Sequence, residues 1–418
     1  MRGGAFLRLK EILASKEASY KLFAKRIARI MTTEKKRLRI GILFGGRSGE
    51  HEVSLISAAS VISALDPEKY DAVPIGISKD GRWLAGTAAH KMLPPALGEV
   101  LRTGESVMLS ADPNVAALVA VSDSRASIPS GRADALHVDV VFPVLHGTFG
   151  EDGAVQGLLD LAGLPYVGSG VLGSAVGMDK DVQKRLFLQA KLPVGDFLAV
   201  PRAEWEKSQA RILREIRKKF RFPVFVKPAT LGSSVGMTKA HDAKELAAAM
   251  DFAGEFAQKI MVERAIRGRE IELSVLGNED PKASIPGEII PHREFYDYAA
   301  KYLEEGTRLL IPAKLTKAQV KKFQEYAVRA FRTLDLLGMA RVDFFLEHRT
   351  GKILLNEVNT IPGFTSISMY PKLWEASGLT YRQLLDRLIE LALEQHRQRQ
   401  RTKYTIELPS VASSAAIE

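Results

Sequence analysis

Short runs of consecutive apolar residues alternate with amphipathic stretches along the first third of the chain. Residues 39–44 and 138–142 are almost continuously apolar, which is typical of strands buried on both faces of a parallel sheet. The first run leads through a glycine-rich turn, residues 45–49, into an apolar helix predicted over residues 54–65. This alternation predicts a small, largely parallel, Rossmann-like α/β domain over residues 38–168.

Later patterns predict two further units that mix strands and helices. Residues 222–228 form an apolar strand, and a Gly/Ser-rich loop follows at residues 231–236. Residues 260–266 form another strand, which leaves toward a linker. The length of the chain, 418 residues, is enough for two or three domains in all.

Residues 341–359 contain two apolar and β-branched runs joined by a short segment with Thr-Gly, which predicts a β-hairpin. If the turn comprises residues 349–351, Asp343 lies directly opposite Glu357. A register slip of one residue would place Asn356 opposite Asp343 instead.

In the first register, Asp343 and Glu357 converge with Asn359, and Arg341 lies beside them, because alternate residues of a strand share a face. Two carboxylates and an amide oxygen are hard ligands of the kind that Mg²⁺ takes. The hairpin alone leaves a second interpretation open, in which these residues form the solvated outer face of an ordinary sheet.

Composition indicates a globular protein, and charge adds little to that picture. The chain has 418 residues, 46% of them apolar, and no cysteine, which excludes disulfide and thiol chemistry and fits a reducing cytoplasm. The net charge of +10 is concentrated at the ends, since residues 1–37 hold eleven Lys or Arg against three Glu. With residues 396–418 adding two more positive charges, the body is neutral, and we expect no nucleic-acid partner.

The basic extension, residues 1–37, has apolar residues at helical spacing and allows several interpretations. It could form an amphipathic helix on a membrane surface, or a transit-like leader, but it lacks the apolar core of a secretory signal. We favour a third interpretation, an upstream start with Met31 as the natural first residue, and we expect no membrane partner. The tail, residues 397–418, is polar and predicted to be disordered.

Two turns of the first domain carry candidate substrate-binding groups. Glu52 follows the 45–49 turn, which aims a helix N-terminus at a small anion or zwitterion, although first-turn acids are also common as partners of the helix dipole. The turn is not a dinucleotide fingerprint, because its first two glycines are adjacent. His146 follows the strand over 138–142, at the end where open α/β sheets bind ligands, although a structural hydrogen-bonding role is equally open.

Lysines near the Gly/Ser loop suggest a phosphate site. Lys227 ends the strand before the loop at 231–236, and Lys180 lies upstream. The loop is rich in backbone and hydroxyl donors that could close over phosphates, but it lacks the spacing of a Walker A loop. Residues 292–312 are aperiodic and aromatic, which is typical of a lid.

Seven short motifs occur in order over about residues 38–395, and together they resemble the D-alanine–D-alanine ligase family of the ATP-grasp superfamily. They are GGRSGEHEVS (45–54), HGTFGEDG (146–153), MDK (178–180), VKP with GSSVG (226–236), FYDY with KY (295–302), RVD (341–343) and NEVNTIPGFT (356–365). The resemblance implies an ATP-grasp fold of the α+β type, with a central subdomain over residues 169–263 and a C-terminal subdomain over residues 264–396 behind the N-terminal domain. The basic extension and the polar tail have no place in the family pattern.

The resemblance implies a reaction in which ATP phosphorylates the carboxylate of one D-alanine and the amine of a second D-alanine displaces phosphate. It implies a nucleotide site made of Lys180, Lys227, Ser234, Glu263, Arg264, Ile266, Glu270, Lys301 and Phe345. The lysines would neutralise the phosphates, while Glu263, Arg264 and the backbone near Ile266 would hold adenine. Two Mg²⁺ ions, for which Mn²⁺ is a substitute, would bind Asp343, Glu357 and Asn359.

The resemblance also implies the groups that handle the two D-alanine molecules. They are Glu52 and Ser233 for the first ammonium, His146, Tyr302 at the lid, Ser368 and the Met369 amide for the second carboxylate, and Arg341 with the Gly363 amide for the oxyanion. In this family a lid tyrosine accompanies D-alanine as acceptor and a phenylalanine accompanies D-lactate, so Tyr302 implies a dipeptide product.

Three other functions remain open at this point. The first is an ATP-grasp carboxylate–amine ligase with other substrates, and the second is a nucleotide-binding or regulatory protein on the same fold without catalysis. The third is a protein bound to a membrane or to nucleic acid through residues 1–37. For the ligase, the resemblance implies a homodimer working in the cytoplasm on peptidoglycan precursors.

Overall fold

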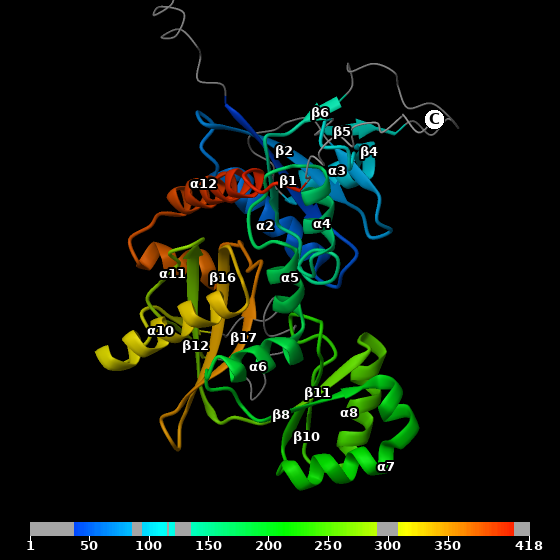
Figure 1. Ribbon diagram of the computed structural model, residues 1–418, viewed down its shortest axis with the longest axis vertical. Coiled ribbons are helices and arrows are strands. Elements are labelled where there is room, and N and C mark those ends of the chain that lie inside the picture. The colour runs from blue at the N-terminus through cyan, green and yellow to red at the C-terminus, as the bar shows by residue number, and fades with distance from the viewer. Residues whose placement is uncertain (1–36, 86–93, 115–116, 122–134, 291–307, 405–418) are drawn as a thin grey trace, which may run out of the picture.

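A computed structural model gives the structure of the protein and describes residues 37–85, 94–114, 117–121, 135–290 and 308–404. In Figure 1 the N-terminal region lies at the top in blue and cyan, the central region at the lower right in green, and the C-terminal region at the left in yellow and orange. Among the described residues, no helix is long and apolar enough to cross a lipid bilayer.

The N-terminal sheet has seven strands, of which only part is parallel. Its strands are β1 (Leu38–Gly45), β2 (Tyr70–Ile77), β3 (Trp83–Ala85), β4 (Glu105–Leu109), β5 (Ala117–Ala120), β6 (Ala135–His137) and β7 (Val140–Pro143). The order is β6-β5-β4-β3-β2-β1-β7, with β1 parallel to both β2 and β7. All pairs from β2 to β6 are antiparallel, so hairpins extend the Rossmann-like part predicted from the sequence.

Helices cover both faces of this sheet, which explains why β1 is almost continuously apolar. The helices of the region are α2 (His51–Ala64), α3 (Pro94–Thr103), α4 (Ala154–Leu161) and α5 (Val171–Met178). Ile40, Ile42 and Phe44 face a core shared with α2 and α3, while Leu43 points to the opposite core with α4. The helix predicted from residue 54 therefore begins three residues earlier, at His51.

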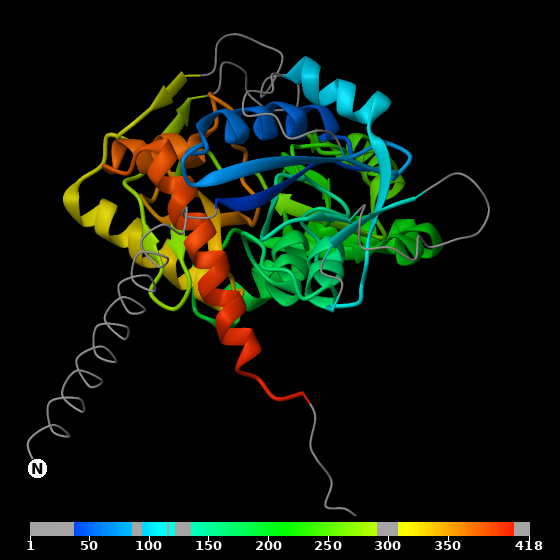
Figure 2. The same ribbon diagram turned by 90° about the horizontal axis from the view of Figure 1, so that it is seen from above.

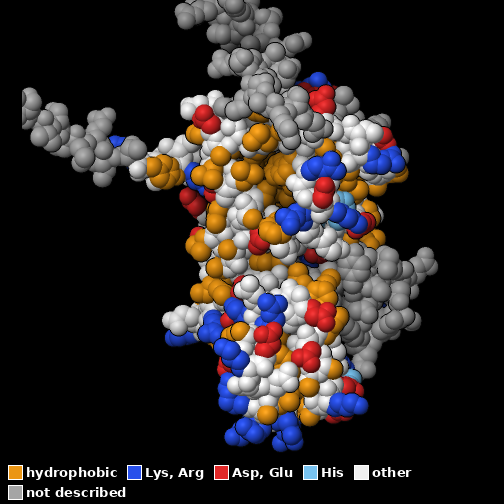
Figure 3. All heavy atoms as spheres, turned by 90° about the vertical axis from the view of Figure 1, so that its right-hand side faces the viewer, with side chains coloured by type: hydrophobic (Ala, Val, Ile, Leu, Met, Phe, Trp, Pro, Cys, Tyr) orange, Lys and Arg blue, Asp and Glu red, His pale blue; other side chains and the backbone are white. Residues whose placement is uncertain are grey.

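The central region is a four-stranded antiparallel sheet with helices on one side. Its elements are α6 (Lys180–Gln189), β8 (Phe197–Pro201), α7 (Arg202–Lys219), β9 (Val224–Pro228), β10 (Thr238–Ala240), α8 (Ala243–Phe256) and β11 (Lys259–Arg264). The strand order is β10-β9-β11-β8. Basic side chains gather at this end of the molecule (Figure 3), where Arg217, Lys218 and Lys219 form the last turn of α7 and complement its dipole.

The C-terminal region builds a six-stranded antiparallel sheet. Its elements are β12 (Gly268–Gly277), β13 (Lys282–Ala283), β14 (Gly287–Ile290), β15 (Arg308–Leu310), α10 (Lys317–Thr333), β16 (Gly338–Glu347), β17 (Ile353–Asn359), α11 (Met369–Ala376) and α12 (Tyr381–Gln400). Thr316 and Gln319 cap α10 with the reciprocal side-chain bonds of a capping box. The core of this region also includes Phe187 of α6, so that helix packs against both regions.

The hairpin of β16 and β17 places Asp343 opposite Glu357, as predicted, but not by the predicted turn. The Glu347 amide donates to the Lys352 carbonyl, so the turn spans four residues, 348–351, instead of three. Phe344 accordingly pairs with Leu355, and a β-bulge at Asn356 then brings Glu357 opposite Asp343.

Helix α12 returns from the C-terminal region to the N-terminal region, where Leu384 and Leu388 enter the core below β1. Figure 2 shows it beside both regions, in red. The prediction of disorder from residue 397 is wrong for its first residues, because α12 continues to Gln400. Arg399 donates to Asp160 and to the Tyr166 hydroxyl, which ties the last turn to the N-terminal region.

Candidate active site

One cavity of about 780 Å³ is lined by residues of all three regions. Its walls are the turn that leads into α2, the segment after β7, the helix α6, the strands β9 and β11, the hairpin β16–β17 and the loop before α11. A cavity of this size is in the range that holds a small organic ligand. We describe it from the hairpin outward.

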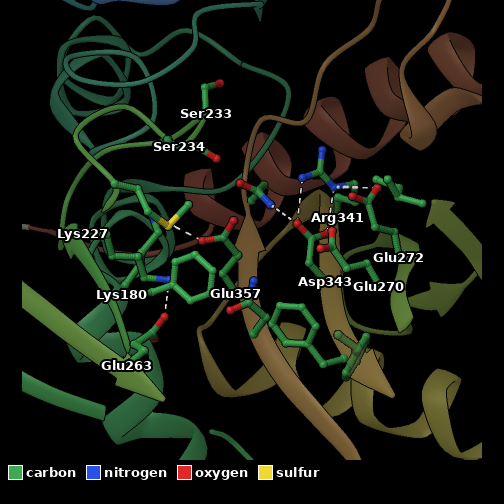
Figure 4. A pocket seen from close by; sticks show the side chains of 18 of the residues that line it. Lys180, Lys227, Ser233, Ser234, Glu263, Glu270, Glu272, Arg341, Asp343 and Glu357 are labelled. Atoms are coloured by element: carbon green, nitrogen blue, oxygen red, sulfur yellow. Dashed lines mark hydrogen bonds and ion pairs between the residues drawn. The ribbon is translucent and has the colours of Figure 1, made fainter. Parts of the chain in front are cut away.

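At the hairpin, an arginine and three oxygen-bearing side chains form one connected group (Figure 4). Arg341 donates from Nε and Nη2 to the two oxygens of Asp343, at 2.8 and 2.7 Å, and Nε lies 3.1 Å from Glu272 Oε2. Asn359 Nδ2 donates to Asp343 Oδ2 at 3.0 Å. The charges of Asp343 and Glu272 raise the pKa of Arg341 against its burial, so this guanidinium stays charged.

Two buried lysines face the hairpin from the central region. Lys180 lies 3.5 Å from Glu357 Oε2 and donates to the Leu231 carbonyl at 2.7 Å, which ties it to the Gly/Ser loop. It begins α6, whose N-cap residue Asp179 accepts hydrogen bonds from two first-turn amides. Lys227, near the end of β9, is only 6% exposed. The cations therefore gather where the sequence pattern suggested a phosphate clamp.

The structure corrects the carboxylate predicted to face the first substrate. Glu52 lies in the first turn of α2, where its side chain is 62% exposed and pairs with Lys79 outside the cavity. Glu50, at the N-cap, is 8% exposed, lines the cavity and accepts a hydrogen bond from Ser233 Oγ. Because the helix begins at His51 and not at residue 54, Glu50 points inward and Glu52 outward. Gly232 approaches Glu50 so closely that a Cβ there would lie 3.1 Å from Oε2.

At the other end of the cavity, one carboxylate lies between two ammonium groups. Glu263 Oε2 is 2.6 Å from Lys227 Nζ, and Oε1 is 2.9 Å from Lys184 Nζ. Although burial favours protonation of Glu263, the two lysines lower its pKa to about 2. Sequence reasoning missed Lys184, which lies one helical turn after Lys180 on α6, a spacing that places both on one helix face.

The loop that carries Gly363 is fixed by side chains from outside it. Glu151 accepts from the Ile361 amide at 3.2 Å, and His146 Nδ1 lies 3.2 Å from the Ile361 carbonyl. Further along, Ser57 Oγ accepts from the Phe364 amide, and the Tyr381 hydroxyl donates to the Phe364 carbonyl. The peptide at Gly363 is thus held from both sides.

Glu151 and His146 are both buried, and burial shifts the pKa of each side chain. Burial, with the charge of Glu50 nearby, raises the pKa of Glu151 to about 8. Burial lowers the pKa of His146, so its ring is neutral at pH 7. Since the second ring nitrogen of His146 lies 3.3 Å from Ser57 Oγ, the geometry favours the structural interpretation of this histidine. The sequence analysis did not single out Glu151 as a site residue, although it lies within the motif HGTFGEDG (146–153).

Most of the predicted site residues line this one cavity. They are His146, Lys180, Lys227, Ser233, Ser234, Glu263, Arg264, Ile266, Glu270, Arg341, Asp343, Phe345, Glu357, Asn359, Gly363, Ser368 and Met369. Glu52 lies outside it, while Lys301 and Tyr302 lie outside the described residues. Met369 begins α11, so its amide belongs to a helix N-terminus directed at the cavity, a position that favours a carboxylate.

The hairpin residues fit divalent cations by their donor set. Asp343, Glu357 and Asn359 supply oxygens from neighbouring positions of two paired strands, and carboxylate and amide oxygens are suited to Mg²⁺. Asp343 is paired with Arg341, and Glu357 lies near Lys180. Asp343 and Glu357 thus already have positively charged partners. A metal ion bound to a phosphate chain could take the place of these partners.

The cavity lies between two antiparallel α+β regions and contains buried lysines, a Gly/Ser loop and a hairpin that carries carboxylates. This combination defines an ATP-grasp enzyme and places the protein among ATP-dependent ligases. Comparisons with known proteins narrow this class. The family descriptions "D-ala D-ala ligase N-terminus" and "D-ala D-ala ligase C-terminus" match residues 39–169 and 186–390.

Individual relatives agree with the family descriptions. The chain is 48% identical over 366 residues to the D-alanine–D-alanine ligase of Natranaerobius thermophilus, covering 88% of this chain and 98% of the relative. It is 49% identical over 368 residues to that of Solibacter usitatus, covering 88% and 99%. The protein belongs to the D-alanine–D-alanine ligase family.

Solved structures share the fold. The D-alanine–D-alanine ligase from Coxiella burnetii has a TM-score of 0.75 at 37% identity, covering 87% of this chain and 96% of that one. The VanG D-Ala:D-Ser ligase from Enterococcus faecalis has a TM-score of 0.75 at 36% identity, covering 85% and 100%. Ligases named for two different acceptors therefore share this architecture.

Proposed function

We propose that the protein joins two D-alanine molecules to D-alanyl-D-alanine, with ATP converted to ADP and phosphate, for the synthesis of peptidoglycan precursors. The observation that supports this most strongly is the convergence, on one cavity, of an acidic hairpin, buried lysines and a separate buried carboxylate, Glu50. The first two groups suit a metal-bound triphosphate. The third suits the ammonium of an amino acid.

The division of labour follows from these positions. Glu50, held by Ser233, binds the ammonium of the first D-alanine, so that its carboxylate faces the nucleotide. Lys180 and Lys227 neutralise phosphate charge as the terminal phosphoryl group moves to that carboxylate and ADP leaves. The acyl phosphate then loses phosphate when the second amine attacks its carbonyl carbon.

The oxyanion of that attack needs donors that are fixed before the reaction. Arg341 is held by Asp343 and Glu272, and the Gly363 peptide is held by its clamped loop, so neither has to reorganise. Ser368 and the Met369 amide bind the carboxylate of the second D-alanine. Asp343, Glu357 and Asn359 would hold two Mg²⁺ ions, for which Mn²⁺ is a substitute, and the metal supplies charge neutralisation at the phosphates.

The remaining expectations stay proposals. Lys301 would add a further phosphate contact, and Glu270 would bind the ribose. Reaction in the cytoplasm is supported by the absence of cysteine and the use of ATP, while assembly as a homodimer rests on the family resemblance. Changing Tyr302→Phe should shift product toward the D-alanyl-D-lactate depsipeptide, and an unchanged product ratio across a pH series would count against this role.

An assay of ADP release tests the proposal directly. Purified protein with ATP, Mg²⁺ and D-alanine should release ADP and form D-alanyl-D-alanine in equal amounts. A panel of other D-amino acids separates this function from that of a related carboxylate–amine ligase, which would turn over faster with a different member. Binding of ATP without turnover on any member would indicate a nucleotide-binding protein without catalysis.

A further inference from the structure

Lys184 is a buried lysine that forms an ion pair with Glu263, a carboxylate that lines the cavity. It lies on α6 one turn after Lys180, and its side chain is 3% exposed. Its Nζ is 2.9 Å from Glu263 Oε1, while Lys227 Nζ is 2.6 Å from Oε2 of the same carboxylate. Glu263 therefore has one ammonium partner for each oxygen.

The two lysines differ in what surrounds them. Lys227 lies near the end of β9, four residues before the Gly/Ser loop that begins at residue 231, and the charges of Glu263 and Glu357 favour its ammonium form. It therefore lies between Glu263 and the acidic hairpin. Lys184 lies in the middle of helix α6, so its backbone is held by a regular element.

A bound triphosphate would change the balance of this group. Phosphate oxygens near the Gly/Ser loop would attract Lys227, and Glu263 would then lose one of its two counter-ions. A buried carboxylate without a partner costs several kcal/mol, so one cation must remain with it. Lys184 is placed to remain, because it is held on α6 and pairs with the other oxygen of the carboxylate, Oε1.

Glu263 lines the cavity, and each of its carboxylate oxygens lies beside one ammonium group. If Lys227 turns to the phosphates, Oε2 loses its partner while Oε1 stays paired with Lys184. A carboxylate accepts hydrogen bonds and does not donate them when it is ionised. A base with an exocyclic amino group would donate to Oε2 in place of Lys227, whereas a base with a carbonyl at that position would direct lone pairs at it.

We propose that Lys184 is a positioning and specificity-determining residue of the base pocket, which keeps Glu263 ionised and oriented so that it selects a 6-aminopurine over a 6-oxopurine. This inference rests on the proposed use of ATP and adds a reason for the choice of base. It assigns Lys227 to the phosphates and Lys184 to the base end.

The test compares Lys184→Met with Lys184→Arg and with Lys244→Met, an exposed lysine on α8 that serves as a matched control. The D-alanine-dependent kcat/KM is measured with ATP and with ITP, which differ in the amino or oxo group at position 6. The wild type should prefer ATP. Lys184→Met should lower the ATP/ITP ratio of kcat/KM by at least about tenfold, the size of one charged hydrogen bond, mainly through KM for ATP.

Lys184→Arg should keep most of the preference, and Lys244→Met should keep all of it. Equal losses with both nucleotides, or an unchanged ratio, would overturn the inference, because a merely structural role would not discriminate between bases. If Lys184→Met does not fold, Glu263→Gln is measured instead, and it must lower the ATP/ITP ratio of kcat/KM by a similar factor. When both variants fold, the double variant should show no further loss of ratio.

A second measurement distinguishes failure of the proposed function from failure of this inference. If the wild type shows no turnover of ATP with D-alanine, direct calorimetric binding of ATP and ITP to the same variants still measures base selectivity. Tight ATP binding that Lys184→Met weakens more than ITP binding supports the inference in that case. Equal weakening of both refutes it.

Discussion

Glu50 and Glu52 are two residues apart, yet the structure gives them opposite surroundings, and this difference allows a sharp prediction. Glu50 is 8% exposed, lines the cavity and is bonded by Ser233, whereas the side chain of Glu52 is 62% exposed and pairs with Lys79. Changing Glu50→Gln removes the charge and keeps the shape. Changing Glu52→Gln does the same at the surface and serves as the control.

The expected magnitude follows from burial. A carboxylate and an ammonium about 4 Å apart attract by about 4 kcal/mol at an effective dielectric constant of about 20. Loss of one member of a buried charge pair costs about 2–5 kcal/mol in measured complexes. At about 1.4 kcal/mol per factor of ten, we take about 2–4 kcal/mol and expect kcat/KM for the first D-alanine to fall by about 30- to 1000-fold in Glu50→Gln.

The assay is the initial rate of ADP release as a function of D-alanine concentration at saturating ATP. Glu52→Gln should stay within about twofold of the wild type, since exposed ion pairs contribute about 0–1 kcal/mol to stability and do not touch the cavity. Circular dichroism and urea unfolding check that both variants fold. A Glu50→Gln variant within threefold of the wild type, or a larger loss in Glu52→Gln, would refute the assignment of the inward carboxylate.

Three further predictions concern the metal site, acid stability and the last helix. Glu357→Gln should abolish most turnover with Mg²⁺ while the fold persists, with the exposed Glu375→Gln as control, and near-normal turnover would contradict the metal assignment. The Glu263 pKa of about 2 lies below its ordinary 4.5, so its ionised form stabilises the native state above pH 4.5, and this contribution is lost as the pH falls toward 2. The unfolding free energy of Glu263→Gln in urea should therefore vary less between pH 6 and pH 3 than that of the wild type, and an equal slope would argue against the pairing. Arg399→Ala should lower the unfolding free energy by about 1 kcal/mol through its lost contacts with the N-terminal region, and unchanged urea midpoints would show that these contacts contribute nothing.

The sequence predicted the class of fold and most residues of the cavity, because ordered motifs constrain position more strongly than any local pattern. It failed where the outcome depended on a helix start. A helix beginning at residue 54 leaves Glu52 in the turn, whereas the observed start at His51 turns Glu52 to solvent and Glu50 inward. Element boundaries are the least certain part of a sequence-based prediction, and here a shift of three residues changed which of the two acids lines the cavity.

Other differences arose from long-range packing. Lys184 looked like any helical lysine, and only the meeting of α6 with β11 shows that it is buried against Glu263. The strands β4, β5 and β6 were missed because residues 85–135 have mixed periodicity, and their pairing comes from hairpins along one sheet edge. The polar residues after His396 predicted disorder. The helix instead continues to Gln400, and its Arg399 pairs with Asp160 of the N-terminal region.

The β-bulge at Asn356 lets one strand place more polar side chains at the cavity than a regular strand could. An unbroken strand shows every second side chain to one side, so four consecutive positions would offer two. Because of the extra residue, Asn356, Glu357 and Asn359 all border the cavity, while Val358 stays in the core. Three polar side chains within four positions thus reach the cavity from a strand and not from a loop, and transplanting these residues onto a regular hairpin would turn one of them away.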